Sequence, residues 1–171
     1  MPEFEQLTVP IRIGLTGDTH RASRNPRALP AAMLRAFAEC DVIFHTGDLN
    51  APWVLNELEK VAPVRVVRGN NEEPPLTTTL PIDLYFRAGD VRIGLMHGHH
   101  LGKTARQNTL SHMHGVVDLA LYGHSHIPEI AEHDGLLMVN PGSPTQKRYQ
   151  PDHTFAIVTV TDVVHAELHT L

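Results

Sequence analysis

Apolar runs that end in a glycine and a polar residue recur along the chain. The clearest lies within residues 41–50, where the run begins after an aspartate and ends at Gly47-Asp48. A short run without polar alternation, ended by glycine, predicts a strand buried on both faces, as in a parallel sheet. Four further runs of this kind end in the stretches 15–20, 66–71, 95–99 and 121–126. All five strand ends place a glycine beside an aspartate, asparagine or histidine.

The first 70 residues alternate predicted strands with predicted helices. Strands are predicted at 11–16, within 41–50 and at 64–67. Asn25 and Pro26 suit the start of a helix, and an apolar stripe at helical spacing extends from there to Phe37. Asn50 suits the N-cap of a second helix over 51–60. This alternation predicts right-handed crossover connections and an α/β fold.

The periodicity changes at Ile82, where apolar residues begin to alternate with polar or small ones. A strand from Ile82 and a returning strand at 91–96 around a turn at Gly89 predict an antiparallel hairpin. The remaining predicted elements are a helix at 103–113, a strand at 116–122, and hairpins pairing 127–131 with 136–139 and 154–160 with 164–168. An antiparallel part therefore joins the parallel one, and the sheets are expected to be mixed.

Composition limits the class of protein. The 171 residues suffice for one domain with a sizeable core, so we expect a single domain over 1–171. The formal charge of −5 excludes the overall basic field of a nucleic-acid-binding protein. Cys40 is the only cysteine, which excludes an internal disulfide and favours a reducing compartment. No stretch approaches the roughly 18 apolar residues of a membrane span. The acidic start does not suit a signal peptide, so we expect a cytoplasmic protein without a membrane partner.

Seven candidate metal ligands lie at the five strand ends. They are Asp18, His20, Asp48, Asn70, His97, His124 and His126. Because open α/β sheets bind ligands at the carboxyl ends of their strands, these side chains are expected to converge. Three pairs in these loops are spaced two residues apart, and on an extended backbone such a pair points to one side. The pairs are Asp18 with His20, His97 with His99, and His124 with His126.

This donor set suits two divalent ions. Seven oxygen and nitrogen donors are too many for one tetrahedral ion and suit two ions that share a carboxylate. Without thiolates, the donors favour Mn, Fe, Ni, Co or Zn over a structural zinc. Two ions about 3.5 to 4 Å apart clamp a phosphate and lower the pKa of a bridging water. The chemistry implied is phosphoester hydrolysis.

Five motifs stand in a fixed order within residues 18–126, and the likeness that they carry extends from about Ile11 to Val160. They read Asp18-x-His20, Gly47-Asp48, Gly69-Asn70-Asn71-Glu72, His97-Gly98-His99 and Gly123-His124-Ser125-His126. As an ordered set they resemble the motifs of the calcineurin-like metallophosphoesterases, and within them the small bacterial and archaeal phosphodiesterases of the YfcE type. The resemblance implies a four-layer α/β/β/α sandwich, which agrees with the parallel-then-antiparallel pattern.

The resemblance also implies a division of the ligands. One ion would be held by Asp18, His20, Asp48 and His126, and the other by Asp48, Asn70, His97 and His124. Asp48 would bridge the two ions. The attacking group would be a metal-bridging hydroxide, with manganese as the first metal to expect.

Three positions are candidates for catalytic roles. Better-known phosphatases of the superfamily carry a histidine where this chain has Asn71, and an amide is a poor proton donor to a leaving group. Weak action on monoesters and better action on activated or cyclic diesters are therefore expected. Arg21 stands where the family usually has glycine, and it is either a contact to the substrate phosphate or a solvated loop residue. His99 is expected to orient the substrate or move a proton, whereas His45 is expected to be a hydrogen-bonded core histidine.

Two other functions are considered. The retromer scaffold subunit has this fold and has lost ligand residues, so a non-catalytic scaffold is the main alternative; here all seven ligand positions carry donors. Residues 97–104 nearly match a phosphate-binding P-loop, but His97 stands where the first glycine is required. A homo-oligomer is also considered, with Trp53, Tyr85 and the C-terminal hairpin as candidate contacts.

Overall fold

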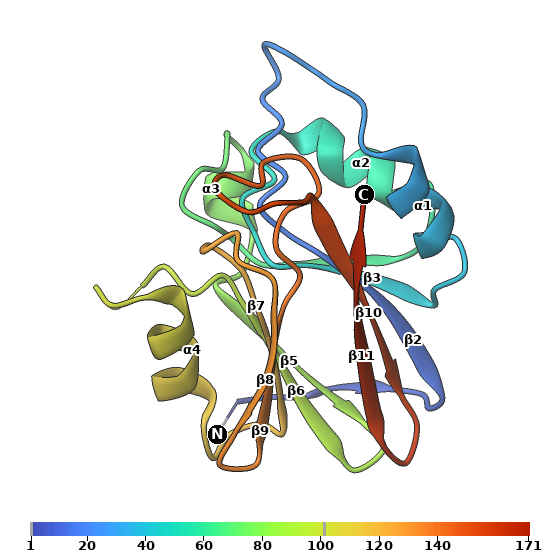
Figure 1. Ribbon diagram of the computed structural model, residues 1–171, viewed down its shortest axis with the longest axis vertical. Coiled ribbons are helices and arrows are strands. Elements are labelled where there is room, and N and C mark those ends of the chain that lie inside the picture. Colours follow the sequence, from blue (N-terminus) through green and yellow to red (C-terminus); the bar gives the residue numbers. More distant parts are fainter. Residues whose placement is uncertain (1, 101) are drawn as a thin grey trace.

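Two mixed β-sheets packed face to face form the centre of the protein in the computed structural model, which describes residues 2–100 and 102–171 (Figure 1). One sheet has six strands, in the order β1 (Glu5–Leu7), β5 (Asp83–Ala88), β6 (Val91–Met96), β7 (Leu119–Tyr122), β9 (Leu136–Asn140) and β8 (Glu129–His133). The other has five, in the order β11 (Val164–Thr170), β10 (Thr154–Val160), β2 (Ile11–Thr16), β3 (Val42–His45) and β4 (Val64–Val66).

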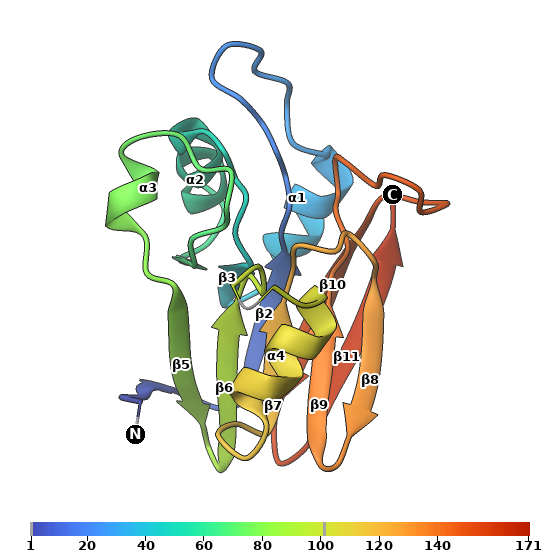
Figure 2. The ribbon, with the colours of Figure 1, turned by 90° about the vertical axis from the view of Figure 1, so that its left-hand side faces the viewer.

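Helices cover the outer faces of both sheets. The helices α1 (Ala31–Phe37) and α2 (Pro52–Glu59) pack on the five-stranded sheet, and α4 (Ala105–Met113) packs on the six-stranded sheet (Figure 2). A fourth, single-turn helix is α3 (Leu76–Thr79). This arrangement confirms the predicted four-layer α/β/β/α sandwich. No helix in the described part of the chain is long and apolar enough to cross a bilayer.

The main core lies between the two sheets. Phe44 of β3 and Phe86 of β5 are fully buried there, with ring centroids 4.5 Å apart. Two outer cores lie under the helices: Phe37 of α1 packs over the five-stranded sheet, and Met113 of α4 packs over the six-stranded sheet. Strands buried on both faces explain the continuous apolar runs in the sequence.

Parallel pairing brings five strand ends to one end of the molecule. In the five-stranded sheet β2 pairs parallel with β3, and β3 with β4. In the six-stranded sheet β6 pairs parallel with β7. The carboxyl ends of β2 and β6 both point upward in Figure 2. The loops that carry the candidate ligands follow these five strands.

Some local elements differ from the sequence-based predictions. Helix α1 begins at Ala31 with Pro30 as its N-cap, not near Asn25 and Pro26. The ring of Pro30 disfavours helical backbone at the preceding residue, which delays the helix. Asn50 does not cap α2: its φ is +71°, and Ala51 holds the N-cap position. The short elements β1 and α3 were not predicted, because three or four residues carry too little periodicity.

Candidate metal centre

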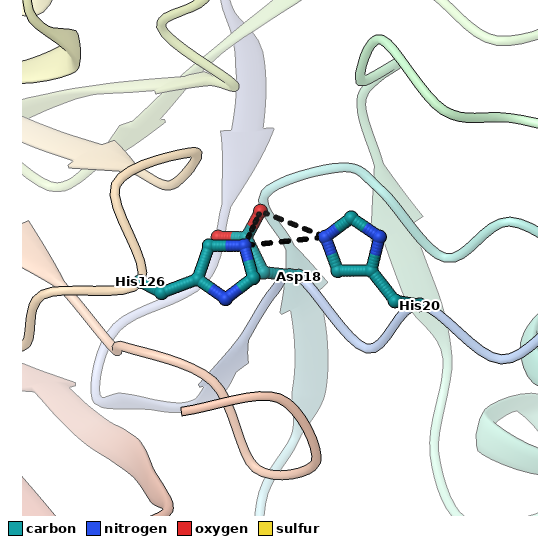
Figure 3. Close-up of side chains that lie close together, drawn as sticks. All are labelled: Asp18, His20 and His126. Carbon is teal, nitrogen blue, oxygen red and sulfur yellow. Dashed lines mark hydrogen bonds and ion pairs between the residues drawn. The ribbon is translucent and has the colours of Figure 1, made fainter. Parts of the chain in front are cut away.

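Six of the seven predicted ligands form two groups at the carboxyl ends of the parallel strands. Asp18, His20 and His126 form the first group, and their ligand atoms lie within 4.8 Å of one another (Figure 3). Asp48, His97 and His124 form the second group, within the same distance. These groups are called the Asp18 group and the Asp48 group below. The seventh residue, Asn70, places its Oδ1 3.1 Å from His97 Nε2.

Each group draws on both sheets. In the Asp18 group, Asp18 and His20 follow β2 of the five-stranded sheet, and His126 follows β7 of the six-stranded sheet. In the Asp48 group, Asp48 follows β3, whereas its two histidines follow β6 and β7. Every group therefore spans the gap between the two sheets.

Asp48 belongs to one group and also lies close to the other. Its Oδ2 is 3.4 Å from Nε2 of His97 in its own group and also 3.4 Å from Nε2 of His20 in the Asp18 group. Burial would raise the pKa of Asp48, but contacts with His97, His20 and Asn71 outweigh this effect and hold the pKa below its usual range.

The histidine rings are oriented from behind by backbone carbonyls. His97 Nδ1 donates to the carbonyl of Thr46 at 2.7 Å, and His126 Nδ1 donates to the carbonyl of Gln146 at 2.5 Å. In a neutral ring held this way, Nε2 carries the lone pair that faces the centre, as in metal-ligating histidines.

The negative charge of Asp18 is only partly compensated by hydrogen bonds. Asp18 Oδ1 is buried and has no hydrogen-bond partner among the described residues. His126 Nε2 lies 3.5 Å from this oxygen, and His20 Nε2 lies 3.8 Å from it. Lone pairs and carboxylate oxygens that face each other in a dry site repel unless a cation lies between them. The donor set of carboxylates, imidazoles and an amide therefore fits divalent ions.

The backbone is left-handed at five of the seven ligands, which corrects the assumption of extended backbone for two of the three pairs. Positive φ angles occur at Asp18 (51°), His20 (43°), Asp48 (56°), His124 (70°) and His126 (60°). Such residues are uncommon outside glycine, although Asp, Asn and His tolerate this region best. The side chains converge because tight turns aim them inward, not because alternate residues of a strand share a side. This conformation costs of order 1–3 kcal/mol per residue, and it persists only where the surroundings impose it.

Neighbouring glycines make the close packing of these loops possible. A Cβ on Gly69 would lie 2.0 Å from Asp48 Oδ1, and one on Gly123 would lie 2.3 Å from Thr46 Oγ1. The glycines beside Asn70 and His124 therefore permit an approach that a side chain would block.

Glu72 ties two of the ligand loops together. Its Oε1 accepts hydrogen bonds from the backbone N–H of Asp48 at 2.7 Å and of Gly69 at 3.0 Å. Its Oε2 accepts one from the N–H of Asn50 at 2.9 Å. Glu72 is buried, and burial raises its pKa. The sequence places Glu72 in a motif but did not predict its structural role. The signal for that role is an acid that directly follows two asparagines.

His45 is the hydrogen-bonded core histidine that was expected. Its ring is fully buried, its Nδ1 accepts from the N–H of Gly47 at 3.1 Å, and its Nε2 lies 3.2 Å from Thr19 Oγ1. Because Nδ1 accepts, the proton of the neutral ring lies on Nε2 and is donated to Thr19. Burial lowers the pKa of His45 to about 3.

The three candidate catalytic residues surround the centre in different ways. His99 lies beside the Asp48 group, with its ring centroid 5.2 Å from that of His97, and burial lowers its pKa to about 4. Asn71 donates to Asp48 twice, from its backbone N–H at 2.9 Å and from Nδ2 at 2.8 Å. Arg21 pairs through its backbone with Asn50, and its Nε is buried without a partner among the described residues.

The P-loop-like stretch 97–104 is used differently here. His97 belongs to the Asp48 group, and Thr104 caps α4 by accepting from the N–H of Gln107 at 3.2 Å. Leu101 lies outside the described residues. The preceding strand β6 pairs antiparallel with β5 on one side and parallel with β7 on the other.

The sequence is similar to a family model and to proteins named as phosphoesterases. A model of the calcineurin-like phosphoesterase superfamily domain matches residues 11–163. A probable metallophosphoesterase of Methanothermobacter thermautotrophicus is 38% identical over 138 residues, which cover 80% of this chain and 78% of the relative. A phosphodiesterase of Methanocaldococcus jannaschii is 24% identical over 148 residues, which cover 77% of this chain and 83% of that protein.

A solved structure with the same fold is that of a Vps29 protein. Vps29 of Entamoeba histolytica, in a structure described as complexed with zinc, superposes with a TM-score of 0.72 at 25% identity. The match covers 94% of this chain and 99% of that one.

Replacing Glu72 with glutamine is expected to destabilise the protein by about 2 kcal/mol, because the new amide N–H₂ must face backbone N–H groups that now have an acceptor. Urea unfolding in EDTA measures this change. The matched control is Glu73→Gln, since the side chain of Glu73 accepts a single hydrogen bond within the described part of the chain, from the N–H of Ser23. Equal destabilisation of the two variants would contradict the role given to Glu72.

His45 is expected to make stability depend on pH. Its pKa of about 3 in the folded state lies below the unfolded value of about 6.5. The unfolded state therefore binds the extra proton first, and stability falls as pH drops below about 6.5. Between pH 7.5 and 5.0, the free energy of unfolding in EDTA should fall by about 2 kcal/mol more in the wild type than in His45→Asn. The exposed control His165→Asn should behave like the wild type; equal losses in wild type and His45→Asn would refute the assignment.

Proposed function

Because the chain belongs to the calcineurin-like phosphoesterase superfamily, we propose that it is a binuclear metal-dependent phosphodiesterase. The observation that carries the proposal is the position of Asp48. Its carboxylate lies at equal distance from a histidine of each group, which supports a role as a ligand shared by two ions.

The residues divide between two cation sites. Asp18, His20, His126 and Asp48 would hold one ion, and Asp48, Asn70, His97 and His124 would hold the other. When bound, the ions supply Lewis acidity for the phosphate oxygens and lower the pKa of the attacking water to near neutrality. Manganese is the first metal to test, with Ni, Fe, Co and Zn as the other candidates for this donor set.

The chain's own residues shape the reaction around this centre. His99, with its pKa lowered to about 4, is neutral near pH 7 and can accept a hydrogen bond or proton from the substrate side. Arg21 lies in the loop that follows His20, and its guanidinium can contact a phosphate oxygen.

Asn71 favours diesters over monoesters. Its amide is bonded to Asp48 and has no proton to give at neutral pH, so leaving groups must depart without a strong acid from this position. Activated or strained alcohols of aryl and cyclic diesters leave readily under these conditions, whereas simple alkyl monoesters do not.

A non-catalytic scaffold is the second candidate, and the resemblance to Vps29 favours it. The two functions differ in one cheap measurement: turnover of bis(p-nitrophenyl) phosphate with Mn²⁺ before and after EDTA. Turnover that EDTA removes supports the enzyme, and the absence of any metal-dependent turnover supports the scaffold.

Asp48→Asn is expected to abolish metal-dependent turnover, because an amide cannot bridge two cations as a carboxylate does. Inductively coupled plasma measurement should show a lower manganese content in the variant than the two ions per chain expected of the wild type. Asp90→Asn, in the exposed turn between β5 and β6, removes the same charge away from the centre and should change neither quantity. Full activity in Asp48→Asn would refute the shared-ligand role.

Asn71→His is expected to raise the monoester-to-diester ratio of kcat/KM by roughly tenfold or more, since an imidazole can protonate the leaving oxygen. The measurement compares glycerol 2-phosphate, an alkyl monoester whose leaving alkoxide needs a proton, with bis(p-nitrophenyl) phosphate at equal manganese content. Asn71→Ala separates loss of the bond to Asp48 from gain of the imidazole. A ratio that is the same in all three proteins would show that this position does not control leaving-group protonation.

A further inference from the structure

The segment between β9 and β10 is fixed to the Asp18 group. Ser143 Oγ donates to the carbonyl of Asp18 at 2.8 Å, and Thr145 Oγ1 donates to the carbonyl of Thr19 at 2.6 Å. The carbonyl of Gln146 accepts the bond from His126 Nδ1. Three contacts within four residues therefore hold residues 143–146 against the loops that carry this group. The segment, orange to red in Figure 1, lies at the same end of the molecule as those loops.

A turn of residues 147–150 follows directly, and its tip presents two side chains. The N–H of Gln150 donates to the carbonyl of Lys147 at 3.0 Å and closes the turn. Lys147 Nζ is bound to the carbonyl of Pro151 at 2.6 Å, so this cation is engaged within its own loop. Arg148 and Tyr149 occupy the tip, and Tyr149 is 99% exposed.

Arg148 is placed in a way that costs energy. Its φ is +52°, a region that an arginine seldom adopts, and such outliers gather at ligand-binding sites. The guanidinium is exposed and forms no ion pair with the residues that the structure describes.

Arg148 lies close in sequence to a residue that contacts the Asp18 group. It follows Gln146 by two residues, and the carbonyl of Gln146 accepts the hydrogen bond from Nδ1 of His126. Because residues 143–146 are held against this group, the long guanidinium side chain of Arg148 is available to an anion bound there.

We propose that the turn of residues 147–150 binds the substrate: Arg148 contacts a non-bridging phosphate oxygen, and the Tyr149 ring stacks on an aromatic ring carried by the esterified alcohol. The substrate class is then a nucleotide phosphodiester, because nucleobases are planar π-systems and stack on exposed aromatic side chains. This inference rests on the proposed function, since it assumes that a phosphate occupies the metal centre.

Equilibrium binding separates the two contacts without requiring turnover. Isothermal titration of the manganese-loaded protein with AMP and with inorganic phosphate compares ligands that differ in the nucleoside. Tyr149→Ala should raise the Kd for AMP by about tenfold and leave that for phosphate unchanged, and Tyr149→Phe should retain the wild-type values. Arg148→Ala should raise both Kd values by about tenfold. The control Arg35→Ala, an exposed cation on α1, should change neither.

The inference is overturned if Tyr149→Ala leaves AMP binding unchanged, if it weakens AMP and phosphate alike, or if Arg148→Ala leaves phosphate binding unchanged. Absence of AMP binding by the wild type overturns it as well. A wild type that binds AMP yet hydrolyses no diester with Mn²⁺ would refute the proposed function, and the binding comparison would still decide the role of the turn.

Discussion

The carboxylates of Asp18 and Asp48 place negative charge where water cannot reach, with 0% and 1% of their residue surfaces exposed. An ionised group in such a position must be compensated by hydrogen bonds or by a cation. Glu72, buried beside them, shows the first solution: three backbone N–H groups face its oxygens. Asp18 Oδ1 has no such partner among the described residues and is surrounded by imidazole nitrogens. The contrast between these neighbouring acids is the physical reason for reading the centre as a cation site.

Sequence patterns predicted the buried strands well because such patterns depend on burial. Strands covered on both faces must be continuously apolar, and β3 and β7 could be recognised for that reason. Glycine next to Asn70 or His124 also has a steric reason, which is the close approach of Gly69 and Gly123 to their neighbours.

What could not be predicted depends on long-range contacts. The left-handed backbone at Asp18 and Asp48 is imposed by tertiary packing, and no residue-by-residue rule announces it. The hydrogen bonds of Glu72 connect the loop of Asp48, which is 24 residues away in the chain, with Gly69, which is three residues away. Only the fold reveals this connection. The late start of α1 at Ala31, by contrast, follows from Pro30 in the sequence. The prediction of an earlier start was wrong because it gave more weight to the apolar stripe than to this proline.

Because each ligand group takes residues from both sheets, the separation of the two sheets sets the distances among the ligand atoms. That separation depends on contacts in the core between the sheets, such as Phe44 on Phe86. Bound cations would hold the two sheets together at the ligand end only, leaving the hairpin tips at the other end to the core alone. Cohesion between the sheets would then come from electrostatic attraction at one end and from hydrophobic contacts over the remaining length.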